Sequence, residues 1–163
     1  MGCLGFREPK GLPKGSYVTE RPRFHLAFPV RDLAEARAFY GELLGCPEGR
    51  SSDEWVDFDF FGHQIVAHLS PNAAGHKEHN QVPSTNQVDG EAVPVRHFGA
   101  ILSMAEWRKL AAHLTERKVS FIITPGIRFE GLQGEQATFF FCDPSGNALE
   151  FKAFHDEANI FAR

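Results

Sequence analysis

The chain has little cysteine, no long apolar run and no strong excess of charge. Its 163 residues include three cysteines, Cys3, Cys46 and Cys142, without a CxxC pair. An odd number of cysteines without such spacing argues against a disulfide framework and against a structural thiolate zinc site. No stretch approaches the roughly 20 apolar residues of a membrane-spanning helix, and no signal-peptide core is present. These absences favour a cytoplasmic protein without a membrane partner.

The charge balance argues against nucleic acid as a partner. The formal net charge is -4 and the sequence pI is about 6.0, and no cluster of basic residues occurs in the chain. A nucleic-acid-binding surface needs such a basic patch. With 42% hydrophobic residues, the chain can bury a core of its own, as one domain or as two small modules that share a sheet.

Two segments of the chain repeat one pattern, which is a strand with a histidine, a helix, and then strands that end on a second ligand-type residue. In the first segment these positions are His25 and His68, and in the second they are His97 and Glu150. Histidine and glutamate at matched places in two modules indicate a metal site that the two modules share.

Each predicted helix begins at a recognisable N-cap. Asp32 with Glu35, and Ser103 with Glu106, have the spacing of helix starts, and Gly45 supplies a stop for the first helix. Apolar residues at helical spacing follow each cap, and alternating apolar residues predict the strands. The expected order is βαβββ twice, which is an α+β fold.

The expected domain boundaries follow from composition. Residues 1–23 are rich in Gly, Pro and charge and are expected to form an arm, and residues 70–94 are polar without a steady period and are expected to form a long connecting loop. The predicted division is an arm (1–23), a first module (24–69), a connecting loop (70–94), a second module (95–154) and a tail (155–163).

Three features of the chain resemble the vicinal oxygen chelate superfamily. They are the tandem βαβββ order, the Asp-Leu-x-x-Ala-x-x-Phe-Tyr helix that starts at Asp32, and the Asp-Pro-x-Gly-Asn-x-x-Glu ending at Glu150. The superfamily includes glyoxalase I, extradiol ring-cleavage dioxygenases and bleomycin-resistance proteins, and the match spans residues 24–154. The runs Gly-Cys-x-x-Gly-Arg-Ser (45–51) and Phe-Phe-Gly-His-Gln (60–64) are most similar to small bacterial-type proteins described as predicted extradiol-dioxygenase-family members.

The resemblance implies a curled, barrel-like mixed sheet around a divalent metal in a central cleft, and a homodimer. The implied ligands are His25, His97, Glu150 and His68, or a two-histidine, one-carboxylate set with His68 nearby. Imidazoles and a carboxylate suit Fe(II), Mn, Zn or Ni. Two histidines and one carboxylate favour non-haem Fe(II), whereas four ligands leave two octahedral positions for adjacent substrate oxygens. The expected partner is therefore a small molecule with vicinal oxygens.

The reaction class stays open between dioxygenase-like and glyoxalase-like chemistry. Extradiol dioxygenases carry a proton-handling Tyr where this chain has Phe140, and a His where residues 131–134 read Gly-Leu-Gln-Gly. In a glyoxalase-like reaction, Glu150 or His68 would be the catalytic base. Arg50 and Arg128 are candidate contacts for a substrate anion or plain surface charges.

A metal-free function is the alternative. Bleomycin-resistance-type relatives use the same fold to bind and sequester a drug, and the 16 phenylalanines would suit an apolar, aromatic-lined pocket.

Overall fold

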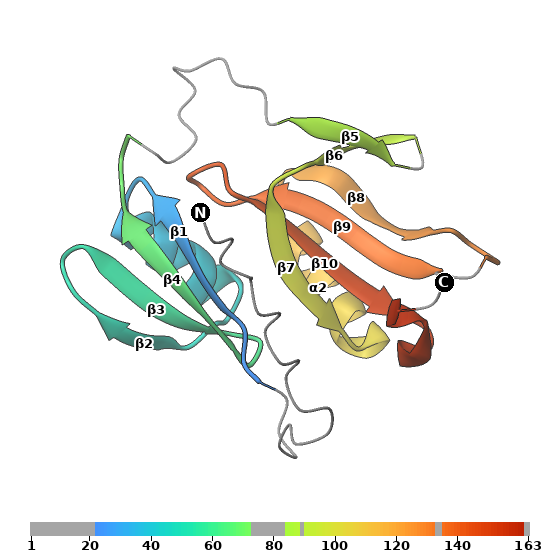
Figure 1. Cartoon of the computed structure of the whole chain (residues 1–163), viewed down its shortest axis with the longest axis horizontal. Coiled ribbons are helices and arrows are strands. Elements are labelled where there is room, and N and C mark those ends of the chain that lie inside the picture. The colour runs from blue at the N-terminus through green and yellow to red at the C-terminus, as the bar shows by residue number, and fades with distance from the viewer. Residues whose placement is uncertain (1–21, 73–83, 89, 133–134, 162–163) are drawn as a thin grey trace, which may run out of the picture.

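The computed structural model describes residues 22–72, 84–88, 90–132 and 135–161. Most of the expected N-terminal arm therefore lies outside the described residues. The first module follows the chain order of a strand, a helix and three strands (Figure 1). Its elements are β1 (His25–Val30), α1 (Leu33–Ala36), the π-helix η1 (Arg37–Leu43), β2 (Glu48–Ser51), β3 (Trp55–Phe60) and β4 (His63–Leu69).

The second module repeats this order after a separate hairpin. The hairpin pairs β5 (Thr85–Val88) with β6 (Glu91–Pro94), so it lies inside the segment 70–94 that was expected to be a connecting loop. The remaining elements are β7 (His97–Leu102), α2 (Met104–Glu116), β8 (Phe121–Arg128), β9 (Gln136–Cys142), β10 (Ala148–Phe154) and the 3₁₀ helix η2 (Glu157–Phe161).

The two modules have the same sheet topology. The strand orders are β1-β4-β3-β2 and β7-β10-β9-β8, and in each sheet the first strand pairs in parallel with the last, while the other neighbours are antiparallel. The predicted α+β class is confirmed, but the predicted barrel-like sheet is wrong for the described chain. The described residues of β1 and β7 pair only with β4 and β10, so two separate four-stranded sheets form, held together by side-chain packing instead of strand pairing.

Local capping explains where both helices begin, as predicted. The Asp32 carboxylate accepts a hydrogen bond from the Glu35 N–H (2.8 Å), and Ser103 and Glu106 form a complete capping box. Gly45 follows the end of the first helix at a φ of 71°, a left-handed conformation that suits glycine. Among the described helices, none is long and apolar enough to cross a membrane.

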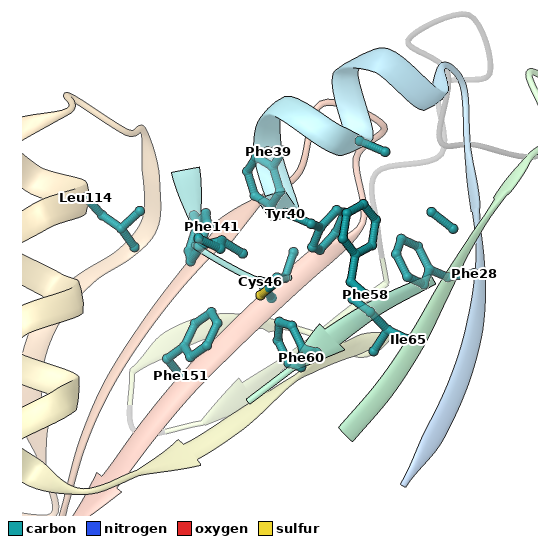
Figure 2. Close-up of a cluster of buried hydrophobic side chains, with 14 of the residues drawn as sticks. Phe28, Phe39, Tyr40, Cys46, Phe58, Phe60, Ile65, Leu114, Phe141 and Phe151 are labelled. Carbon is teal, nitrogen blue, oxygen red and sulfur yellow. The ribbon is translucent and has the colours of Figure 1, made fainter. Parts of the chain in front are cut away.

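One apolar core joins the two modules. In Figure 2, Phe39 and Tyr40 of the first module lie near Phe141 of the second. The ring centroids of Phe39 and Phe141 are 5.8 Å apart, and those of Phe28 and Phe98, again one from each module, are 5.1 Å apart. Fully burying such a side chain is worth about 1.5–3 kcal/mol. Packing of the helix-covered sheet faces therefore fixes the modules against each other.

The Asp-Pro-x-Gly-Asn turn is part of the same junction. The Tyr40 hydroxyl donates to Asp143 Oδ2 (2.9 Å), and the Asn147 amide donates to the Pro29 carbonyl (2.9 Å). Burial raises the pKa of Asp143, although hydrogen bonds from Asn147 and Tyr40 oppose that shift. Burial also raises the pKa of Tyr40 well above its ordinary value, and the neighbouring Asp143 charge adds to the shift. The motif that ends at Glu150 thus has a structural role between the modules.

Candidate functional site

His97 and Glu150 meet on neighbouring parallel strands of the second sheet. His97 opens β7, Glu150 lies on β10, and His97 Nε2 is 3.2 Å from Glu150 Oε2. The other ring nitrogen, Nδ1, is 2.5 Å from the Pro94 carbonyl oxygen. Because a carbonyl oxygen can only accept, Nδ1 must carry the hydrogen. Glu150 is 8% exposed, whereas His97 is exposed on the edge strand β7, so the contact joins a buried carboxylate to an imidazole that solvent can reach.

Two further polar side chains hold the Glu150 carboxylate. The Thr138 hydroxyl donates to Oε1 (2.9 Å), and Lys152 Nζ lies 3.3 Å from the same oxygen. Sequence reasoning missed both residues. Lys152 was predictable, because it lies two residues after Glu150 and residues two apart on a strand share a face. Thr138 is on the neighbouring strand, so its contact with Glu150 depends on the register between the strands.

Phe140 completes the surroundings of His97. Its ring meets the imidazole edge-on, with centroids 5.2 Å apart, and the side chain is 1% exposed. The position that was compared with a proton-handling tyrosine therefore holds an apolar ring in contact with a candidate ligand. Such an edge-on aromatic contact restricts the imidazole without offering a proton.

His25 belongs to a polar chain on the first sheet. His25 Nδ1 is 2.7 Å from Gln64 Oε1, and Gln64 Nε2 donates to Asp57 Oδ2 (3.0 Å). The Arg50 guanidinium is 3.6 Å from the same Asp57 oxygen. His25, Gln64 and Asp57 border a cavity of about 410 Å³ that Asp59 and His63 also line. Gln64 ends the Phe-Phe-Gly-His-Gln run, but sequence reasoning assigned no site role to it or to Asp57.

The strand register shows how the histidines of the two modules correspond. Glu150 lies two residues beyond the register partner of His97. In the first module, the residue two beyond the partner of His25 is Val66. His68 comes two residues later again, at an exposed position. The register therefore aligns Glu150 with Val66. His68 lies two residues further along β4 than this expected ligand position.

The chain brings together only part of the expected ligand set. Among the described side chains, no three of His, Cys, Asp or Glu form a group that could hold a metal ion. His97 and Glu150 meet on the second sheet, whereas His25 and His68 belong to the first. In Figure 1, β1 and β7 run in opposite directions, and His25 and His97 are their first residues. The two histidines thus begin strands that point opposite ways.

The two arginines considered as anion contacts differ in their surroundings. The Arg50 side chain is 82% exposed and lies beside the cavity-lining Asp57. Arg128 is 8% exposed and donates to the Val88 carbonyl. Of the two, only Arg50 is available to a ligand from solvent.

Comparisons with known proteins agree with the tandem modules. The model of the Glyoxalase/Bleomycin resistance protein/Dioxygenase superfamily matches residues 24–151. A solved glyoxalase/bleomycin resistance protein/dioxygenase from Alicyclobacillus acidocaldarius is 37% identical, with a TM-score of 0.69 over 86% of this chain and 96% of that one. Two further solved structures share the fold. A lactoylglutathione lyase from Agrobacterium tumefaciens is 15% identical, with a TM-score of 0.58 over 90% of this chain and 100% of that one. A glyoxalase/dioxygenase from Nostoc punctiforme is 18% identical, with a TM-score of 0.59 over 83% of this chain and 92% of that one. No curated protein matches the chain. The chain belongs to the glyoxalase/bleomycin resistance protein/dioxygenase superfamily.

Proposed function

We propose that this protein is a metal-dependent enzyme that acts on a small substrate with two adjacent oxygens, by dioxygenase-like or glyoxalase-like chemistry. The His97–Glu150 pair carries the proposal. Since the Pro94 carbonyl takes the Nδ1 hydrogen, Nε2 is the ring nitrogen that faces a Glu150 carboxylate oxygen, 3.2 Å away. A proton on Nε2 or a bound cation can join the two groups at this distance, and Lys152 supplies a positive charge only to the other carboxylate oxygen. An imidazole nitrogen and a carboxylate oxygen held this close are ligand types that a divalent metal ion prefers.

The donor set fits a divalent metal. We propose His25, His97 and Glu150 as the ligands, since the register aligns these positions better than His68. Two imidazoles and one carboxylate suit Fe(II), Mn, Zn or Ni and leave positions open for substrate. When bound, such a metal polarises substrate oxygens as a Lewis acid, and Fe(II) can in addition support oxygen chemistry.

We propose that the site is completed in a homodimer, with His25 from one subunit and His97 and Glu150 from the other. Two observations support this arrangement. Among the described residues of a single chain, no third ligand joins the His97–Glu150 pair. His25 is exposed on the other sheet, where a second copy can reach it. A two-fold dimer would then contain two equivalent sites.

The chain's own residues suggest the proton chemistry. Thr138 and Lys152 hold one oxygen of Glu150, so the second oxygen remains directed at His97. In the glyoxalase-like reaction, Glu150 takes the proton from the carbon next to a carbonyl and returns it to the neighbouring carbon. His68, outside the ligand set, is the second candidate base. Phe140 offers no proton at its position beside His97, which favours this branch over ring cleavage.

The first test is the metal content of untagged protein purified without chelator. We expect about one metal per chain in the wild type and in His155→Ala, an exposed control position beyond β10, and loss of metal in His97→Ala. Iron would direct assays to catechol ring cleavage, and Zn, Ni or Mn to isomerase or lyase substrates. A protein that holds no metal and does not take up added metal would be a metal-free binder, and the proposal would be wrong.

Mixed dimers test the shared site. In a dimer of one His25→Ala and one His97→Ala subunit, a site shared between subunits leaves one intact and one doubly altered centre. Random mixing should then restore metal to about one quarter of all sites, because about half of the dimers are mixed. If the site lies within one chain, mixing restores none.

A further inference from the structure

We propose that Gln64 and Asp57 act as positioning residues that fix the tautomer of His25, so that its Nε2 presents a lone pair. The inference rests on the proposed function, in which His25 is a ligand, and adds how the first sheet prepares that ligand. It concerns residues to which no motif of the sequence assigns a role.

The chemistry of the three groups determines the tautomer. Asp57 is 6% exposed, and its carboxylate can only accept hydrogen bonds. The amide nitrogen of Gln64 must therefore face Asp57, at 3.0 Å, which turns the amide oxygen toward His25. That oxygen is 2.7 Å from His25 Nδ1 and likewise can only accept. Nδ1 then carries the hydrogen, and Nε2 of the neutral imidazole is left with its lone pair.

The geometry of the sheet explains why this relay can form. His25 and Gln64 are register partners on the parallel strands β1 and β4, so their side chains project from the same face. Asp57 lies on β3, the next strand, opposite Val66. Val66 is two residues after Gln64, so Asp57 and Gln64 project from the same face of the sheet. A polar chain thus crosses three adjacent strands on the face opposite the apolar core. Burying Asp57 is unfavourable unless its carboxylate is paired, and Gln64 and the Arg50 guanidinium both meet its Oδ2.

The second module reaches the same tautomer with a different acceptor. There the backbone carbonyl of Pro94 takes the Nδ1 hydrogen of His97. One module uses a side-chain amide and the other a main-chain carbonyl, but in both the hydrogen of a neutral ring is held on Nδ1. Hydrogen bonds of this kind orient ligating imidazoles, and their loss typically lowers metal affinity about 10–100-fold. In both modules Nε2 is therefore the ring nitrogen turned away from the backbone or amide acceptor, and at His97 it faces Glu150.

The experiment reads the tautomer directly in the metal-free protein. Long-range ¹H–¹⁵N spectra of ¹⁵N-histidine-labelled protein are recorded at about pH 8.5, where an ordinary imidazole is neutral, and the His25 signals are identified by their loss in His25→Ala. We expect His25 to carry its hydrogen on Nδ1 in the wild type. In Gln64→Leu the ring should relax to the mixture of an unrestrained imidazole. Gln87→Leu, the same change on the exposed strand β5, should leave the His25 signals unchanged.

A swapped pair separates positioning from a structural role. In Asp57→Asn with Gln64→Glu, the amide at 57 can donate to the carboxylate at 64, which can accept from His25 Nδ1. The double variant should restore the Nδ1–H tautomer. Affinity for added Co²⁺, followed by its visible absorption, should fall about 10–100-fold in Gln64→Leu and recover in the double variant.

The outcomes separate this inference from the proposed function. Wild-type His25 with its hydrogen on Nε2, an unchanged tautomer in Gln64→Leu, or a folded double variant without recovery would each overturn the relay, whether or not metal binds. A wild type that shows the Nδ1–H form, loses it in Gln64→Leu and regains it in the double variant supports the relay. If that same protein binds no Co²⁺, the metal-dependent function fails and the tautomer assignment stands.

Discussion

Adding one methyl group at Gly99 should separate the two strands that carry the candidate site. Gly99 on β7 is the register partner of Glu150 on β10, and a Cβ at this position would lie 1.5 Å from the Glu150 carbonyl oxygen and 2.6 Å from its carbonyl carbon. Both neighbours are backbone atoms, so no side-chain rotation relieves the contact. The strands would have to move apart by roughly 2 Å, which breaks hydrogen bonds whose normal length is about 2.9 Å.

The cost of Gly99→Ala follows from this displacement. Overpacking alone costs about 1–3 kcal/mol, and each ladder hydrogen bond that is lost adds about 0.5–1.5 kcal/mol. We therefore expect the free energy of unfolding to fall by about 3 kcal/mol or more. For a chain of this size, that corresponds to a melting temperature lower by about 6–12 °C. Urea denaturation and differential scanning calorimetry measure the two quantities independently.

The second sheet contains a matched control. At Gly126 on β8, the nearest atom to an added Cβ is the Thr124 carbonyl oxygen at 3.8 Å, an ordinary contact. Gly126→Ala should be neutral or stabilise by about 0.4–1 kcal/mol, because alanine restricts the unfolded chain. If the two variants unfold at the same temperature, the close approach of β7 and β10 at Gly99 is refuted as the reason for glycine there.

Three further experiments test the interior and the N-cap of α2. Tyr40→Phe removes the hydrogen bond to buried Asp143 and should lower the free energy of unfolding in urea by about 1.5–3 kcal/mol. Because the folded-state pKa of Tyr40 is raised, its contribution to the stability of the wild type is complete below about pH 10 and should decline above that pH. The Tyr40→Phe variant should show a smaller decline. Burial, with a smaller effect of a nearby aspartate charge, raises the pKa of the Cys46 thiol to about 12. Native protein at neutral pH should therefore be alkylated at exposed Cys142 before Cys46. Equal labelling rates of the two cysteines, read by mass spectrometry, would contradict the burial of Cys46. Ser103→Ala removes the capping box of α2 and should lower the free energy of unfolding by about 1 kcal/mol, a loss that Ser103→Asp should largely avoid.

Features set by short-range interactions were predictable from the sequence. The N-caps at Asp32 and Ser103 depend on a residue three positions away, and both form as expected. Strands with one apolar face, such as β3 and β10, show in the spacing of their apolar residues. The π-helix from Arg37 to Leu43 has no such signal, since the same apolar spacing fits an ordinary helix turn.

Strands without an apolar face were not predictable in this way. All residues of β2 and β5 are exposed, so hydrophobic alternation cannot mark them. They form because neighbouring strands offer hydrogen-bond partners, β3 for β2 and β6 for β5. The segment expected to be a loop throughout therefore contains a hairpin.

The sequence by itself determined the tandem modules, the α+β class and the kinds of residue available to a metal site, because these depend on composition, periodicity and neighbours a few positions apart. The tertiary structure decided that His97 meets Glu150, that Val66 and not His68 aligns with Glu150, and that His25 pairs with Gln64. It also decided that the two sheets stay separate and pack through an aromatic core. These features depend on the register and packing of segments far apart in the chain, and a shift of one residue would turn each side chain to the other face.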